Sequence, residues 1–261
     1  MELTRRGFLS LTAASAFCLL CAGCGDAAAV SPAGTLTAHT GGTGLSYWLY
    51  TPQSTGTPKT LVLYLHGGSG KGSDLNAVLE AESLPRFLQE GQLAPDAYVV
   101  MPQLPASCKG WSDRTAQLLQ LLAVIKAQYP IARTALTGHS MGGTGCWDLA
   151  LAHPEVFCAA APLSGSVRLT EQNLTALQSL PVWAVVGSAD TIVKPDVLDL
   201  VIKHLNYSTS YRFAIRTLSK KGAEYHSKWY GYGNGRQWAD WFGLDTEIRY
   251  DTPDVFEVGS I

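Results

Sequence analysis

A short glycine-flanked segment holds the residues of this chain that are best suited to covalent chemistry. It reads Gly138-His139-Ser140-Met141-Gly142 and follows a short apolar run. The pattern predicts a strand that turns sharply into a helix with Ser140 at the apex, the arrangement called a nucleophile elbow. The serine of such a turn has a strained backbone, and a Cβ at either flanking glycine would collide with a neighbouring strand or helix. Ser140 is therefore the candidate nucleophile.

A serine hydroxyl becomes a good nucleophile only when a base takes its proton and an acid orients that base. Asp190 follows an apolar strand candidate and a tight turn, which places it at a strand's carboxyl end, where ligands bind in open α/β sheets. His226 comes later in a loop, so the residues follow the order Ser, Asp, His that is typical of such folds. We predict Asp190 as the orienting acid and His226 as the base. The alternatives lie inside a predicted helix that begins near residue 195: Asp196 and Asp199 for the acid, and His204 for the base.

Attack on a carbonyl creates an oxyanion that needs fixed N–H donors. The glycine-rich run 66–70 directly follows a predicted strand, so its backbone can approach a ligand at the edge that carries Ser140. The candidate donors are the backbone N–H groups of Gly68 and Met141. A plain tight turn is the alternative for the run, and Lys71 does not complete the pattern of a phosphate-binding loop.

The elements that must position these residues follow from apolar periodicity. Most strand candidates are continuous apolar runs, as in strands that are covered on both faces of a parallel sheet. Strands alternate with helices, which predicts an α/β fold with a doubly wound, mostly parallel sheet. About 17 residues separate the strand ending near Leu163 from the one starting at Pro181, which is too few for a large cap. The predicted strands are 45–50, 60–65, 97–101, 134–138, 157–163, 182–186 and 211–217, and the predicted helices span 112–125, 141–153, 171–178 and 195–205.

Composition limits the class of protein further. The chain has 261 residues, of which 46% are hydrophobic and 15% charged, with a formal net charge of −2. The length suits one large domain, and the charge lacks the basic excess of nucleic-acid-binding proteins. Since no cluster of His, Cys and Asp has the spacing of metal ligands, we expect neither a metal nor an organic cofactor. We also expect a monomer.

The N-terminus carries the features of an export signal. Two arginines, Arg5 and Arg6, precede the apolar run 9–22, and the pair followed by Phe-Leu resembles a bacterial twin-arginine signal. Small residues then precede Cys24 as in a lipoprotein cleavage site, with an ordinary secretory signal as the alternative. We predict a signal over 1–23, a flexible tether over 24–44 and a catalytic domain over 45–261. The protein is then exported to the cell envelope, with Cys24 as its lipid anchor and its contact with the membrane.

The cysteines fit this interpretation. If Cys24 carries lipid, three cysteines remain after the signal, and an odd number leaves at least one unpaired. A twin-arginine substrate also folds before export in a reducing compartment. We therefore expect no disulfide framework, and we expect Cys146 and Cys158 to behave as small buried hydrophobic residues.

Several motifs together resemble the α/β-hydrolase superfamily over about residues 45–243. Within it, the chain looks like bacterial secreted hydrolases of the predicted-peptidase and phospholipase/carboxylesterase-like group, relatives of feruloyl and acetylxylan esterases. The motifs are Leu65-His66-Gly67-Gly68, Gly138-His139-Ser140-Met141-Gly142-Gly143, Gly187-Ser188-Ala189-Asp190, His226, and Met101-Pro102-Gln103-Leu104-Pro105 followed by Gly110-Trp111.

The resemblance implies a serine hydrolase that cleaves carboxylic esters of small or carbohydrate-linked substrates. A serine peptidase is the enzymatic alternative, since the same triad cleaves both bonds, and an inactive binding module is the non-enzymatic one. Trp111, Trp229 and Tyr230 are candidate walls for a sugar or aromatic ring. For the last two, local packing of their aromatic-rich loop is an equal alternative.

Overall fold

The computed structural model divides the chain into two units, Met1–Ser31 and Pro32–Ile261, and the residues it describes all belong to the second. The predicted signal, Cys24 and the helix expected over 195–205 lie outside the described residues. The described residues are 34–41, 44–54, 56–81, 83–170, 173, 180–182, 184–187, 190–193 and 216–218.

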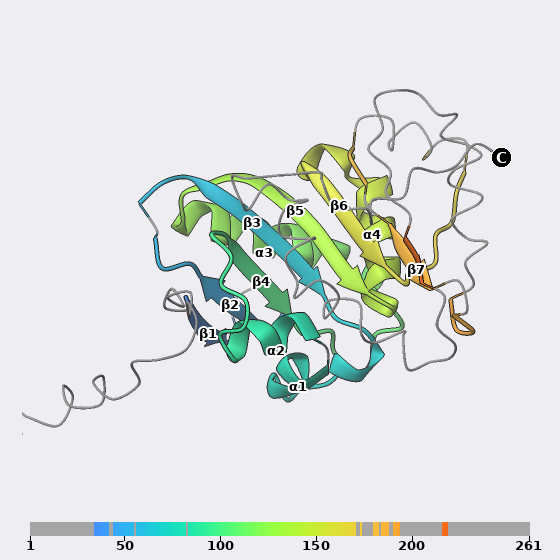
Figure 1. Ribbon diagram of the computed structural model, residues 1–261, viewed down its shortest axis with the longest axis horizontal. Coiled ribbons are helices and arrows are strands. Elements are labelled where there is room, and N and C mark those ends of the chain that lie inside the picture. The colour runs from blue at the N-terminus through green and yellow to red at the C-terminus, as the bar shows by residue number, and fades with distance from the viewer. Residues whose placement is uncertain are drawn as a thin grey trace, which may run out of the picture. The chain divides into compact units, whose positions relative to one another are not determined.

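The described strands form one sheet of eight strands in the order β1-β2-β4-β3-β5-β6-β7-β8. The pairs β1–β2 and β2–β4 are antiparallel, and every later pair is parallel. The mostly parallel sheet expected from the continuous apolar runs is thus confirmed (Figure 1). The strands are β1 Thr35–His39, β2 Tyr47–Thr51, β3 Lys59–Leu65, β4 Tyr98–Pro102, β5 Ile131–His139, β6 Ala159–Leu163, β7 Val185–Gly187 and β8 Arg216–Leu218.

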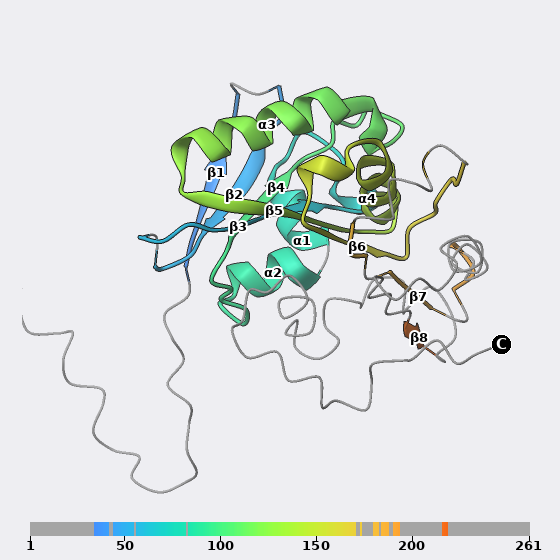
Figure 2. The same ribbon diagram turned by 90° about the horizontal axis from the view of Figure 1, so that it is seen from above.

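Helices cover both faces of the sheet, which confirms the doubly wound arrangement. Helices α3 (Thr115–Gln128) and α4 (Met141–Ala152) lie on one face, and α1 (Asn76–Ala81) and α2 (Ser83–Gln89) lie on the other (Figure 2). Sequence periodicity did not indicate α1 and α2, because a helix of six or seven residues is too short to show a repeating apolar face. Three single turns of 3-10 helix complete the described elements: η1 Gly68–Gly70, η2 Trp111–Arg114 and η3 Pro154–Val156.

The strand pleat divides the core between these two faces. Along β3, Leu61, Leu63 and Leu65 pack into the core under α3 and α4, while Val62 and Tyr64 pack into the core over α1 and α2. All five side chains are fully buried. Because side chains alternate along a strand, a strand that is buried on both faces is apolar at most positions. This is why residues 61–65 of β3 are recognisable from sequence as an unbroken apolar run.

The tether predicted over 24–44 needs a correction, because Thr35–His39 forms strand β1 at the edge of the sheet. β1 pairs with β2 from Thr35 opposite Thr51 to His39 opposite Tyr47. The His39 ring also stacks on the Tyr47 ring with centroids 4.7 Å apart. The strand is mostly exposed, so its residues need not be large or apolar, and composition alone resembled that of a linker.

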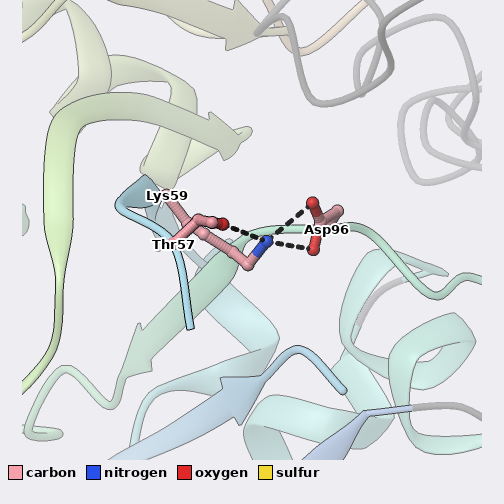
Figure 3. Close-up of polar contacts among 3 residues, drawn as sticks. All are labelled: Thr57, Lys59 and Asp96. Atoms are coloured by element: carbon pink, nitrogen blue, oxygen red, sulfur yellow. Dashed lines mark hydrogen bonds and ion pairs between the residues drawn. The ribbon is translucent and has the colours of Figure 1, made fainter. Parts of the chain in front are cut away.

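A buried lysine ties β3 to the segment that leads into β4. The Lys59 ammonium lies 2.7 Å from Oδ1 and 2.8 Å from Oδ2 of Asp96, and it donates to Thr57 Oγ1 at 3.3 Å (Figure 3). The Lys59 side chain is only 5% exposed, whereas that of Asp96 is 60% exposed. A buried ammonium needs such partners, because its removal from water is costly. The pair lies at the amino end of β3, opposite the end that carries the site.

The three cysteines after residue 100 are free thiols in the structure. Cys146 is fully buried in the core, and Cys158 is partly buried. Burial raises the pKa of both thiols, because the thiolate would lose its hydration. The expectation that they act as small hydrophobic residues is confirmed for Cys146 and holds in part for Cys158. Within the described part of the chain, no helix has the length and hydropathy needed to cross a bilayer.

Candidate active site

Ser140 lies in the sharp turn that the sequence predicts. Strand β5 ends at His139, helix α4 begins at Met141, and Ser140 between them has φ +54° and ψ −118°. These angles are those of the first central residue of a type II′ turn, a position that favours glycine. The Ser140 N–H donates to the Leu163 carbonyl at 2.9 Å, and the Ser140 carbonyl accepts from the Thr144 N–H at 2.9 Å. The strained backbone is therefore held from both sides.

The flanking glycines are required for the reason that the sequence suggested. A Cβ on Gly138 would lie 2.5 Å from the Gly142 carbonyl oxygen, and a Cβ on Gly142 would overlap the Leu65 carbonyl of β3. These neighbouring atoms belong to the backbone, so they cannot move aside as the end of a flexible side chain can. The elbow is thus built from three backbone segments in contact, with no room for a methyl group between them.

The loop after β3 is positioned by His66, a role that sequence reasoning missed. His66 is fully buried, its Nε2 accepts from the Leu104 N–H at 3.0 Å, and its Nδ1 lies 2.6 Å from the Gly67 carbonyl oxygen. Since Nε2 is the acceptor, the proton belongs on Nδ1, which donates to that carbonyl. His66 is then a neutral structural histidine. Its contacts explain the glycine at 70, where a Cβ would meet the ring at 2.6 Å.

Gln103 fastens the same loop from the other side. It is buried, and its amide nitrogen donates to the Gly70 carbonyl at 3.0 Å and to the Asp74 carbonyl at 2.6 Å. Its backbone N–H donates to the Ser46 carbonyl at 2.8 Å. The motif around residues 101–105 therefore holds the loop that contains Gly68. The signal in the sequence that could have indicated this role is that Gln103 directly follows the buried apolar strand β4.

Trp111, the first candidate wall residue, is almost fully buried. Trp111 is 1% exposed, its Nε1 donates to the His66 carbonyl at 3.0 Å, and its ring lies edge-on to the His66 ring with centroids 4.9 Å apart. A Cβ on Gly145 of α4 would lie 2.6 Å from the Trp111 Cβ. Trp111 is packed between α4 and the post-β3 loop, so most of its side chain stabilises the site, and it also belongs to the lining of a pocket beside α4. Its role as a wall remains a prediction.

Asp190 follows β7 and lies at the same edge of the sheet as Ser140. Because β3, β5, β6 and β7 are neighbouring parallel strands, the segments that follow them share the carboxyl edge. Asp190 is 8% exposed, and its Oδ1 accepts from the N–H groups of Ile192 at 2.8 Å and Val193 at 3.0 Å. These bonds fix the direction of the carboxylate. His226, Trp229 and Tyr230 lie outside the described residues, so their predicted roles remain predictions.

The two candidate oxyanion donors have a common structural setting. Gly68 is the first residue of η1, and Met141 is the first residue of α4. The first N–H groups of a helix have no acceptor within that helix. Gly68 is exposed, and a Cβ built on it meets nothing within 4 Å, so open space lies beside it. Both groups can therefore donate to a ligand.

A pocket of about 760 Å³ lies beside α4, and its lining includes Met141, the residue after Ser140. Thr144 and Asp148 of α4 line it together with residues of the segment 109–115 and with Ser166, Arg168, Thr170 and Asn173. Burial raises the pKa of the Asp148 carboxyl, and the nearby Arg168 guanidinium partly opposes that shift. Among the described residues, no group of His, Cys, Asp and Glu could hold a metal ion.

The sequence belongs to the family described as Putative esterase, which matches residues 46–244. The protein is thus an α/β-hydrolase of an esterase family. No curated protein matches the chain as a relative.

Solved esterase structures have the same fold. A thermostable esterase matches with TM-score 0.64 and 21% identity over 80% of this chain and 60% of its own. The feruloyl esterase module from Clostridium thermocellum, in complex with sinapinate, matches with TM-score 0.58 and 16% identity over 82% of this chain and 90% of its own. The S-formylglutathione hydrolase of Staphylococcus aureus matches with TM-score 0.58 and 17% identity over 82% and 99%. This chain spans less than two thirds of the thermostable esterase.

Proposed function

We propose that this protein is a serine esterase that cleaves carboxylic esters of small or carbohydrate-linked substrates. The observation that carries the proposal is the backbone of Ser140, held at φ +54° between β5 and α4. Such strain persists only where the surrounding structure imposes it, and it is characteristic of functional sites. Ser140 lies in the turn where β5 ends and α4 begins, at the carboxyl edge of the sheet.

In the proposed reaction, Ser140 Oγ attacks the ester carbonyl carbon while His226 takes the hydroxyl proton. The carbonyl oxygen becomes an oxyanion that accepts hydrogen bonds from the N–H groups of Gly68 and Met141. The intermediate collapses, the bond to the alcohol oxygen breaks, and His226 gives its proton to that oxygen. Water then attacks the acyl-serine by the same steps, which releases the acid and restores Ser140. Asp190 orients His226 and stabilises its cation.

The preference for esters rests on the family and on the fold neighbours. The chain belongs to an esterase family, and one structural neighbour is a feruloyl esterase module that holds sinapinate, an aromatic acid. The 21 residues between β6, which ends at Leu163, and β7, which begins at Val185, are too few for a large cap and argue for an open cleft, which suits a small acyl group. A closed apolar groove would be needed to favour long acyl chains.

Two measurements test this function. A fluorophosphonate probe should label the wild type and fail to label Ser140→Ala, whereas equal labelling of both would exclude Ser140 as the nucleophile. A panel of 4-nitrophenyl esters and peptide anilides should show turnover of the esters. Turnover of anilides alone would establish a peptidase instead, and a folded protein that is inactive toward probe and panel would be a binding module.

A further inference from the structure

In the pocket beside α4, two oppositely charged side chains lie near each other without a hydrogen bond or an ion pair between them. Asp148 and Arg168 both line it, and their electrostatic interaction affects the pKa of the carboxyl. Within the described part of the chain, neither side chain forms a hydrogen bond or an ion pair with the other or with a further residue. A half-buried carboxylate without a hydrogen-bond donor costs free energy, because part of its hydration is lost and not replaced. The site therefore suits a ligand that donates a hydrogen bond to Asp148.

The walls around this pair are internally fixed, so the pocket has a defined shape. The Ser166 N–H donates to Thr144 Oγ1 of α4 at 3.0 Å. Further along the same wall, the Asn173 amide donates to the Arg168 carbonyl at 2.9 Å and its oxygen accepts from the Thr170 N–H at 2.6 Å. These bonds hold the backbone that carries Arg168 beside the helix. A preformed pocket of this kind lowers the entropy that a ligand must lose on binding.

The lining combines hydroxyl groups with apolar surface. Ser112, Thr115 and Thr170 line it with hydroxyl groups, and Met141 and Leu151 of α4 provide apolar surface. A sugar ring has the same two kinds of surface, hydroxyls on its edge and C–H groups on its faces. Two neighbouring hydroxyls could donate to the Asp148 carboxylate and accept from the Arg168 guanidinium. The volume, about 760 Å³, lies in the usual range of ~300–1,000 Å³ for ligand pockets.

We propose that this pocket binds the alcohol half of a carbohydrate ester, with Asp148 and Arg168 as the residues that select a vicinal diol. The inference rests on the proposed esterase function, because it assigns a subsite to the substrate of Ser140. Met141, the residue after Ser140, is one of the lining residues, and Asp148 follows about two helical turns later on α4, so a sugar bound at Asp148 extends along the helix toward the elbow.

The kinetic test compares two acetyl esters, 6-O-acetylglucose and 4-nitrophenyl acetate, which share the acyl group and differ in the alcohol. The quantity is the ratio of kcat/KM for the sugar ester to kcat/KM for the nitrophenyl ester. Asp148→Asn should lower this ratio about tenfold, the effect of one charge-assisted hydrogen bond. Arg168→Gln should lower it in the same direction. The matched control is Glu155→Gln, which removes one negative charge from an exposed residue in η3, outside the pocket, and should leave the ratio unchanged.

A second measurement decides the case without hydrolysis. Saturation-transfer NMR with methyl glucoside and the Ser140→Ala protein should show transfer to the sugar, and Asp148→Asn in that background should abolish it. An unchanged kinetic ratio in Asp148→Asn, or equal transfer with and without Asp148, would overturn the sugar subsite. If the wild type hydrolyses neither ester, the proposed function fails, and the NMR result still accepts or rejects the pocket as a sugar site.

Discussion

Replacing Ser140 by glycine should stabilise the protein relative to replacing it by alanine. Both changes remove the nucleophile, but only glycine relieves the backbone at φ +54° and ψ −118°. A non-glycine residue in such a region costs ~1–3 kcal/mol. Glycine also makes the unfolded chain more flexible, which offsets ~0.4–1 kcal/mol of the gain. The glycine variant should therefore have the larger free energy of unfolding, by about 0.5–2 kcal/mol.

The assay is chemical and thermal unfolding of the two variants side by side. For a domain of 150–250 residues, 1 kcal/mol corresponds to a Tm change of ~2–4 °C, so the variants should differ by about 1–8 °C. Both should lose ester turnover by at least about a thousandfold, because removal of the nucleophile leaves mainly binding and oxyanion effects.

Ser73 provides the matched control, because it is exposed and is not among the described residues with positive φ. At Ser73 the order should reverse, with the alanine variant more stable than the glycine variant. If Ser140→Ala proves as stable as Ser140→Gly, the turn stores no strain, and the argument that carries the proposed function loses its physical basis.

Four further predictions address other parts of the molecule. Asp96→Asn should lower the free energy of unfolding by about 1 kcal/mol, because it removes the charged partner of the buried Lys59 ammonium. The loss is small because Asp96 itself is largely exposed. An unchanged urea unfolding curve would show that water or Thr57 is a sufficient partner for the ammonium. Ester kcat/KM should rise with pH through an apparent pKa of about 6–7, since protonated His226 cannot accept the Ser140 proton and the neutral ring can; a flat profile from about pH 5 to 8 would argue against His226 as base. Acetyl to butyryl nitrophenyl esters should be preferred over long-chain ones, and an optimum at about ten carbons or more would show an apolar groove worth ~0.8 kcal/mol per methylene. We propose export with a lipid anchor on Cys24, so Cys24→Ser should move the protein from the membrane fraction to the soluble exported fraction. A wild-type protein that is already soluble after export would contradict the lipid anchor and favour an ordinary secretory signal.

The parts of the site that could be predicted are those determined by local sterics. Gly138 and Gly142 flank Ser140 because backbone of β3 and α4 passes within contact distance, and only glycine leaves room for it. Such a constraint appears in the sequence as a fixed spacing. The central strands were recognisable for a similar reason, since both faces of β3 are buried and residues 61–65 are all apolar.

Other features depend on residues that are distant in the chain. His66 binds the backbone of Leu104, 38 residues later, and its carbonyl accepts from Trp111, 45 residues later. Nothing near His66 in the sequence distinguishes this structural role from a catalytic one. The same packing buries Trp111, whose aromatic ring suggested a substrate wall. Strand β1 was missed because an exposed edge strand needs no apolar pattern of its own. It is held in the sheet by its pairing with the neighbouring strand β2.

The sequence by itself determined the mostly parallel sheet without its edge strand β1, the elbow, and the order of Ser140, Asp190 and His226, because apolar burial and glycine spacing are properties of short segments. Only the tertiary structure decided that His66 and Gln103 hold the post-β3 loop and that Asp148 and Arg168 share a pocket beside α4. Those relations join side chains across strands and loops, and their energies depend on distance and burial in space. The pattern of residues along a short segment shows neither these distances nor this burial.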